Sequence, residues 1–529
     1  MLNADFLPQK GNEMKKLRIP SLILSALLIL AVFTGCSASK DSMGGENYAP
    51  EDGGDDYIGG NEYDEEAEGT PDSNDPTADS LPLYENPFIE TSVQNISTFS
   101  ADVDTASYTY FRKLAGQGYT FSELKTQISR STLRTEEMIN YFDYSYTLPT
   151  EGETFGTKAT VAKTPWNDNS YLLMLGIATE KMTEKGANNL VFLIDVSGSM
   201  ASDDKLPLLK KAFSNLVAAL DENDRVSIVT YSGKEEVVLS GCKGNRDEEI
   251  MNAINSLEAS GSTNGEAGLT RAYSIAKDYF IADGNNRIIM ASDGDLNVGI
   301  SSETELKSYI ETKRDEGIFL SVLGFGTGNY KDEKMSALAQ NGNGVYYYID
   351  GEREAEKVLG EDLFATLYTV AKDVKFQLEF NSDHVSKYRL IGYETRMLNT
   401  EDFDDDTKDA GDVGAGHSIT VCYEIILADG ASEAENAEFA KLKMRYKAPD
   451  SDESVLRERS IGTADVTDAP DDDFKFVCAV IEATMILNGS KYNAKGVDMS
   501  EVYETLTTLN ISEDEDKTEF KNIINKLIS

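Results

Sequence analysis

Between about residues 186 and 372, short apolar runs alternate with segments whose apolar residues recur every three or four positions. The run at 190–195 is continuous, as expected of a parallel strand buried on both faces, whereas Leu209, Phe213 and Leu216 form one helical stripe. This alternation predicts an α/β fold with a doubly wound, mainly parallel sheet over residues 186–372. We expect strands at 190–197, 224–233, 235–241, 285–295, 318–328 and 344–350, and helices at 205–220, 246–259, 265–280, 303–317, 331–340 and 352–371.

The two regions beside this sheet, residues 85–185 and 373–468, carry alternating runs typical of antiparallel strands with one solvent-exposed face. We expect them to pack together as a β-rich domain, because a domain whose ends lie close together can be inserted into another. Residues 469–529 predict a helical C-terminal segment, with Cys478 as a core residue of its first helix. The predicted strands are 157–166, 170–180, 374–381, 417–428 and 440–449, and the helices are 474–487, 500–510 and 516–528.

The first 36 residues have the pattern of a secretory signal. A basic start with Lys15, Lys16 and Arg18 precedes an apolar run at 19–33 and a close on Thr-Gly-Cys at Cys36. This order predicts a signal peptide, and the alternative is a single N-terminal membrane anchor. Either way the bulk of the chain lies outside the cytoplasm. Met14 is favoured as the natural start, because signals begin close to their charged region.

Residues 37–84 predict an acidic, disordered tether. Residues 41–80 contain 14 Asp or Glu and no Lys or Arg, with scattered Gly, Pro and Ser. Too few apolar residues are present to offset the entropy that ordering would remove. A coil of this length has a root-mean-square reach of roughly 35–40 Å, so it would hold the folded part clear of a membrane surface.

Composition narrows the function classes. The chain has 529 residues, 40% of them hydrophobic, which favours two or three domains. Its formal net charge of −44 argues against nucleic-acid binding, which depends on Lys and Arg at phosphates, and suits an exported protein. The four cysteines form no CxxC pair and no Cys/His spacing, which argues against zinc. We interpret His384 and His417, the two histidines, as ordinary loop or strand residues and not as catalytic groups.

Small oxygen-bearing residues follow three of the predicted α/β elements. Asp195, Ser197 and Ser199 leave one strand, Thr263 lies in a Gly/Ser/Thr loop, and Asp293 leaves another strand. Ligands of doubly wound sheets bind beyond the carboxyl ends of the strands, so we expect these side chains to meet there. Carboxylates and hydroxyls suit Mg²⁺ or Mn²⁺. A coordination position would stay open for the carboxylate of a partner.

At these positions the sequence resembles the metal-ion-dependent adhesion site of von Willebrand factor A domains, a Rossmann-like fold. The D-x-S-x-S pattern at 195–199, the loop threonine Thr263 and the aspartate Asp293 carry the likeness. The resemblance implies that Ser197, Ser199 and Thr263 bind the ion, Thr263 sometimes through water. It implies that Asp195 and Asp293 hold it directly or through waters. The alternative is an A domain that keeps the fold without the ion.

A wider likeness extends over nearly everything after residue 85. Segments such as 97–113, 136–144 and 324–335 resemble the YfbK-type bacterial lipoproteins, in which an A domain lies between a family-specific N-terminal segment and a C-terminal region. The Gly-Cys ending of the signal is similar to the bacterial lipoprotein signal. The resemblance implies lipidation of Cys36 and a protein held by lipid at the extracytoplasmic face of the cell membrane.

Three weaker motifs receive plain structural interpretations. The stretch at 102–108 offers Asp102 and Asp104 to an ion, but a strand end and a helix cap are favoured. The acidic run at 402–412 has Thr407 where an EF-hand needs Gly, so a solvated loop is favoured over calcium binding. The GFGTG at 324–328 follows a strand but lacks the third glycine of a dinucleotide fingerprint, so a turn explains it.

These observations predict a binding module and not an enzyme. A cell-surface lipoprotein would capture a protein or other envelope partner that offers a carboxylate to the metal, with no nucleotide or nucleic acid involved. The first alternative is a structural component of an envelope complex in which the ion only stabilises loops. The second is a metal-dependent hydrolase, for which the sequence indicates no positioned His, Lys or further carboxylate as a base.

Overall fold

The computed structural model describes most of the chain after residue 84. The predicted signal, Cys36 and the tether lie outside the described residues, and so does Thr263. The chain divides into two units, 1–71 and 72–529, and every described residue belongs to the second. Within that part, no helix combines the length and apolar character needed to cross a bilayer. The described residues are 85–128, 133–181, 186–262, 265–282, 284–294, 303–326, 332–362, 367–449 and 451–528.

A six-stranded sheet forms the centre of the α/β domain, with strand order β10-β9-β8-β5-β6-β7. All neighbours are parallel except β7, which runs antiparallel to β6. The central strand β5 is buried at all eight positions, as its continuous apolar sequence predicts. The strands are β5 (Asn188–Asp195), β6 (Arg225–Tyr231), β7 (Glu235–Lys243), β8 (Asn285–Ser292), β9 (Phe319–Phe325) and β10 (Tyr346–Ile349).

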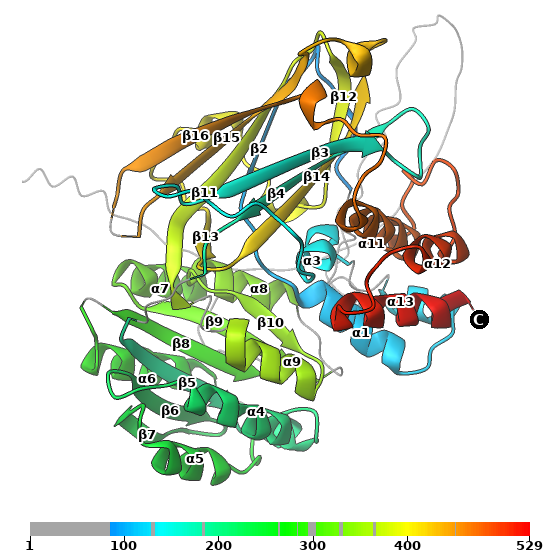
Figure 1. Cartoon of the computed structure of the whole chain (residues 1–529). Coiled ribbons are helices and arrows are strands. Elements are labelled where there is room, and N and C mark those ends of the chain that lie inside the picture. Colours follow the sequence, from blue (N-terminus) through cyan, green and yellow to red (C-terminus); the bar gives the residue numbers. More distant parts are fainter. Residues whose placement is uncertain are drawn as a thin grey trace, which may run out of the picture. The chain divides into compact units, whose positions relative to one another are not determined.

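Helices cover both faces of this sheet (Figure 1). Alternate residues of each strand point to opposite faces, so Phe192 packs with Phe213 of α4 while Leu193 packs with Leu269 of α6. The doubly wound, mainly parallel α/β prediction is therefore confirmed. The helices are α4 (Leu206–Ala218), α5 (Asp247–Asn255), α6 (Gly265–Asp278), α7 (Glu303–Asp315), α8 (Asp332–Asn341) and α9 (Glu352–Lys357), and η1 (Gly198–Ala201) is a short 3-10 helix.

The last predicted helix of this domain, 352–371, is shorter than expected. Helix α9 ends at Lys357, and one π-helical turn, η2 (Val358–Asp362), follows it. Strand β11 begins at Thr369, so the helix prediction is wrong over its last three residues. Thr369 and Val370 are β-branched, and Thr369 pairs with Gly414 in a sheet partner that is distant in the sequence.

The flanking regions supply two antiparallel sheets (Figure 1). Strands of the N-terminal segment enter both, since β3 and β4 lie beside β14, and β2 pairs with β11. The first sheet has the order β1-β12-β14-β4-β3, with β1 (Ile89–Glu90), β3 (Gly156–Lys163), β4 (Tyr171–Ala178), β12 (Val385–Ile391) and β14 (Ser418–Leu427). The second has the order β13-β11-β15-β16 with β2 beside β11, and contains β2 (Ile96–Ser100), β11 (Thr369–Phe380), β13 (Gly411–Gly414), β15 (Glu438–Lys447) and β16 (Ser454–Gly462).

The expectation of one wet face holds for β15 but is wrong for β4 and β14. Strand β15 alternates between buried and partly exposed residues, whereas β14 has seven consecutive buried positions. One side of β14 contributes Val421 to the core between the two sheets. The other side contributes Cys422 to a core that includes Phe476 of α11. Helical cover on the second face removes the alternation, because both sets of side chains are buried.

Three helices lie in the segment predicted to be β-rich, and three more form the C-terminus. The sequence around Tyr108 and Phe111 is rich in Thr and aromatic residues, which favour strands, yet it forms a helix. Tertiary contacts decide this, because both rings pack against Phe520. The helices are α1 (Ala106–Gly116), α2 (Phe121–Ile128), α3 (Thr135–Asn140), α11 (Asp472–Asn488), α12 (Met499–Thr507) and α13 (Glu515–Ile528).

Candidate functional site

The D-x-S-x-S segment forms a tight turn at the carboxyl end of β5. Asp195 is the last residue of the strand, and its Oδ1 accepts a 2.8 Å hydrogen bond from the Ser197 amide. The hydroxyl oxygens of Ser197 and Ser199 lie 3.0 Å apart. Side-chain bonding back to the amide two residues on is the turn that Asp favours, so the local sequence itself places these oxygens together.

Asp293 reaches the same edge from β8. Strands β5 and β8 are parallel neighbours, with Ile194 beside Ala291, so both chains leave the sheet at one edge. The Ser292 hydroxyl lies 3.5 Å from Asp195 Oδ2 and donates to it. The structure therefore brings Asp195, Ser197, Ser199 and Asp293 together, while Thr263 lies outside the described residues. That these residues bind an ion stays a prediction.

The site is electrostatically suited to a cation. Burial raises the pKa of Asp195 to about 6, the hydrogen bonds from Ser197 oppose that rise, and the negative charge of Asp293 adds to it. Both carboxylates are buried, at 0% and 5% exposed for the whole residues. Two carboxylates and two hydroxyls are hard oxygen donors, which fit Mg²⁺ or Mn²⁺. A bound cation would favour the charged form of both carboxylates.

The sequence prediction missed one cation that already stands in the site. The ammonium of Lys205 donates to Asp293 Oδ2 at 2.8 Å and to the carbonyl oxygen of Ser199 at 2.9 Å. The expectation that no lysine is positioned here is therefore wrong. Lys205 lies just before α4, and its sequence context suggested only the start of a helix. Its spacing from Ser199 gave no signal, because the contact depends on where Asp293 leaves β8.

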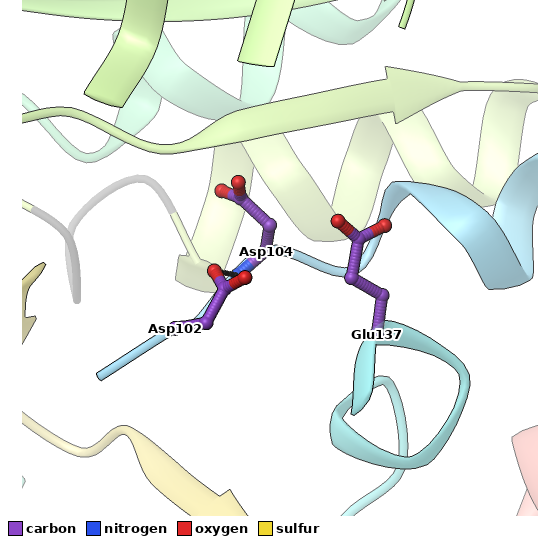
Figure 2. A group of neighbouring side chains, drawn as sticks. All are labelled: Asp102, Asp104 and Glu137. Atoms are coloured by element: carbon purple, nitrogen blue, oxygen red, sulfur yellow. Dashed lines mark hydrogen bonds between the residues drawn. The ribbon is translucent and has the colours of Figure 1, made fainter. Parts of the chain in front are cut away.

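A second group of carboxylates, Asp102, Asp104 and Glu137, lies before α1 and on α3 (Figure 2). Their buried oxygens approach within 4.8 Å of one another. Protein donors surround them, because Arg396 holds both oxygens of Asp102 at 2.7 and 2.8 Å and reaches Asp104 at 3.2 Å. The amide of Tyr346 also donates to Asp104 at 3.0 Å. This arrangement is an ion-paired hub joining the N-terminal segment to β10.

The predicted helix-cap role of Asp102 and Asp104 is wrong. Thr105 is the N-cap of α1 and makes no capping bond through its side chain. Glu137 of α3 supplies the cap, since it accepts 2.8 Å bonds from both the amide and the hydroxyl of Ser107. The two aspartates face Arg396 and Tyr346 instead, because the chain segment before α1 runs beside them.

The acidic run at 402–412 lies over cationic side chains of the second sheet. Arg445 pairs with Asp404 at 2.5 Å, and Lys447 donates to the Asp406 carbonyl oxygen at 2.7 Å. The residues at 404–409 are exposed, in agreement with the predicted loop. At the GFGTG motif, Gly326 has a φ of 77°, which a turn requires, and the residues after it lie outside the described part.

A polar cavity of about 210 Å³ lies at the opposite end of the α/β sheet. Arg287 of β8 and Asn343 before β10 line it from that domain, and Arg396, Asp412 and His417 line it from the flanking regions. Burial lowers the pKa of His417 to about 4, so its imidazole is neutral at neutral pH. The cavity is remote from Asp195 and forms no part of the candidate metal site.

Comparisons with known proteins agree with this architecture. Residues 189–361 match the family described as von Willebrand factor type A domain, and residues 79–174 match one described as von Willebrand factor. Residues 365–529 match the family described as Uncharacterized protein YfbK, C-terminal. The chain is thus a von Willebrand factor type A domain protein. Such a domain indicates a protein-interaction or adhesion function, and domains of this kind commonly bind a divalent ion.

Similarity to one relative extends through the flanking regions as well. The chain is 40% identical to Uncharacterized protein YfbK of Escherichia coli strain K12, over 77% of this chain and 74% of that protein. The chain belongs to the YfbK family of A-domain proteins. It is 30% identical to human inter-alpha-trypsin inhibitor heavy chain H3 over 32% of this chain, which is 20% of that protein. A solved von Willebrand factor type A protein from Catenulispora acidiphila covers 72% of this chain and 91% of its own, at 14% identity and a TM-score of 0.41.

Proposed function

We propose that this protein captures an envelope partner, a protein or another surface ligand, through a divalent ion held by Asp195, Ser197, Ser199, Thr263 and Asp293. The ion is Mg²⁺ or Mn²⁺, and the partner supplies a carboxylate to its open position. A lipid on Cys36 and the acidic tether hold the protein at the extracytoplasmic face of the membrane. The proposal assigns no reaction to the site.

One observation carries the proposal. Four of the five predicted ligands are described, and all four meet at the carboxyl edge between β5 and β8, where the ammonium of Lys205 shows that a cation fits beside Asp293. Hydroxyls of Ser197 and Ser199 leave the shell weakly charged. An ion in such a shell retains affinity for a further carboxylate, which is the reason that a partner is expected there.

The experiment compares the chain in Mg²⁺, the chain in EDTA and the Ser197→Ala variant in Mg²⁺. Titration calorimetry with Mg²⁺ and Mn²⁺ measures ion binding, and capture from envelope extracts identifies the partner. We expect the variant and EDTA to abolish ion binding or weaken it more than tenfold, and to abolish capture. Ser214→Ala is the matched control, because Ser214 is exposed on α4 and bonds only a carbonyl of its own helix in the described contacts.

Two results contradict the proposal in different ways. A partner retained under all three conditions places recognition in the flanking domains, which is the structural-assembly alternative, with the ion only stabilising loops. Undiminished Mg²⁺ and Mn²⁺ binding by the Ser197→Ala variant moves the ion to another site. Phosphoester hydrolysis that disappears in an Asp195→Ala variant would favour the hydrolase alternative.

A further inference from the structure

Lys205 lies across the candidate metal site. Its ammonium bonds Asp293 Oδ2 at 2.8 Å and the Ser199 carbonyl oxygen at 2.9 Å, so it joins two of the predicted ligand residues. The side chain of Lys205 is 15% exposed and that of Asp293 is 2% exposed. The pair is thus largely withdrawn from water, where its attraction is stronger than that of a surface ion pair.

The protein provides a defined seat for this lysine. Gly326 follows β9, and a Cβ added there would come within 2.3 Å of Lys205 Cε. The Tyr348 hydroxyl donates to the Gly326 carbonyl oxygen at 2.6 Å and so fixes the backbone beneath the lysine. On the other side, Ser202 and Lys113 of α1 both bond Asp204, the residue before Lys205. The lysine is therefore positioned from β9, from α1 and from its own loop.

The same carboxylate serves two cations. A divalent ion that uses Asp293, directly or through a water, competes with the ammonium of Lys205 for that carboxylate. Two cations sharing one partly buried carboxylate repel each other, and the repulsion is weakly screened there. We infer that Lys205 is a tethered counter-cation, which holds Asp293 when no ion is bound and which a divalent ion must displace. This inference rests on the proposed function of the site.

The exchange has two thermodynamic consequences. Lys205 stabilises the ion-free protein, because it neutralises a carboxylate that is buried in the fold. It also lowers the affinity for the divalent ion, because binding requires the ion pair to be broken. Removing the ammonium should therefore shift both quantities in opposite directions. A residue that only oriented Asp293 for the ion would shift them in the same direction.

The test uses the full chain and the Lys205→Met variant, with Mg²⁺ and Mn²⁺ alone as probes. We expect calorimetry to show about tenfold tighter ion binding by the variant. In EDTA the variant should unfold at a lower temperature than the wild type, and the rise in Tm on adding Mn²⁺ should be larger. Lys205→Arg, which keeps the charge, should bind the ions like the wild type.

Lys211→Met is the matched control, because it removes the same charge from α4 at a side chain that is 66% exposed. It should change neither quantity, which separates local competition from the loss of net charge. Ion binding by Lys205→Met that equals or falls below the wild type overturns the inference. If that result accompanies loss of binding in Ser197→Ala, the proposed site stands and only the role of Lys205 fails. If no variant binds an ion, both fail. A Lys205→Met chain that folds only with Mn²⁺ supports the inference.

Discussion

At the scale of single residues, the candidate site depends on side chains that the turn after β5 and the end of β8 bring together. Asp195 is held by the amide of Ser197 within its own turn, so local chemistry fixes it. Asp293 is held by Lys205, a residue 88 positions away in the sequence. The first contact follows from the motif, while the second depends on how β5 and β8 lie side by side.

Gly326→Ala tests the seat of Lys205. The glycine has a φ of 77°, which costs an alanine roughly 1–2 kcal/mol, and the added methyl would also push the lysine stem away from its place. We expect a lower Tm in EDTA and tighter Mn²⁺ binding, in the same direction as Lys205→Met but smaller. Thermal unfolding and calorimetry measure these.

The control for this prediction is Gly116→Ala, because a Cβ at Gly116 meets no atom within 4 Å. It should leave the stability and the ion affinity at or above the wild-type values. Weaker ion binding by the Gly326→Ala variant would contradict the proposed seat.

At the scale of elements, α11 explains why the first β-sheet has no solvent-exposed face. Asp471 caps the helix by accepting a bond from the Phe474 amide at 2.9 Å, and Gly489 ends it in the left-handed conformation. Between these ends nearly every residue is buried, because the helix lies between the sheet and α12. One of its buried residues, Glu482, is a carboxylic acid.

Glu482 gives α11 a pH-dependent contribution to stability. Burial raises its pKa to about 8 from 4.5, the charge of Glu501 adds to the rise, and Lys495 opposes it. The folded chain thus binds this proton more tightly than the unfolded chain does. The stabilisation is complete below pH 4.5 and is lost as the pH rises through about 8.

The Glu482→Gln variant should remove that dependence. At pH 8.5 we expect its Tm to exceed that of the wild type by about 2–4 °C, and the difference to vanish near pH 5. Glu504→Gln, an exposed change on α12, should show no such pH-dependent difference. An equal Tm for wild type and Glu482→Gln at both pH values would place the titration of Glu482 near its ordinary range.

At the scale of the whole described molecule, buried ion pairs join the A domain to the flanking segments. Arg112 of α1 bonds Asp350 at 2.6 Å and Glu354 at 2.7 Å, both beyond β10. The hub of Asp102, Asp104 and Arg396 joins β10 to the second sheet region through the Tyr346 amide. These contacts favour cooperative unfolding of the A domain and the flanking regions.

Arg396→Met should break this coupling. Two buried carboxylates would lose their cation, which costs about 3–5 kcal/mol when one partner of a buried pair is removed. We expect scanning calorimetry to show one transition for the wild type and two for the variant, with the A domain unfolding separately. Arg457→Met on the exposed edge strand β16 is the control and should unfold like the wild type. A single transition at the wild-type temperature for Arg396→Met would show that the hub does not couple the domains.

The sequence by itself determined the elements whose signals are local. The continuous apolar run of β5, the helical stripe of α4 and the turn chemistry of Asp195 to Ser199 each depend on residues a few positions apart, and they predicted the α/β sheet and its edge. The motif also indicated Asp293, because strands of a doubly wound sheet end at one edge.

Only the tertiary structure decided the features that depend on distant partners. Strand-prone α1 is a helix because of aromatic contacts with α13, and β14 is buried on both faces because α11 covers it. Lys205 enters the site because β8 delivers Asp293 beside it. In each case the deciding contact joins residues far apart in the chain, and their relative positions exist only after the chain has packed.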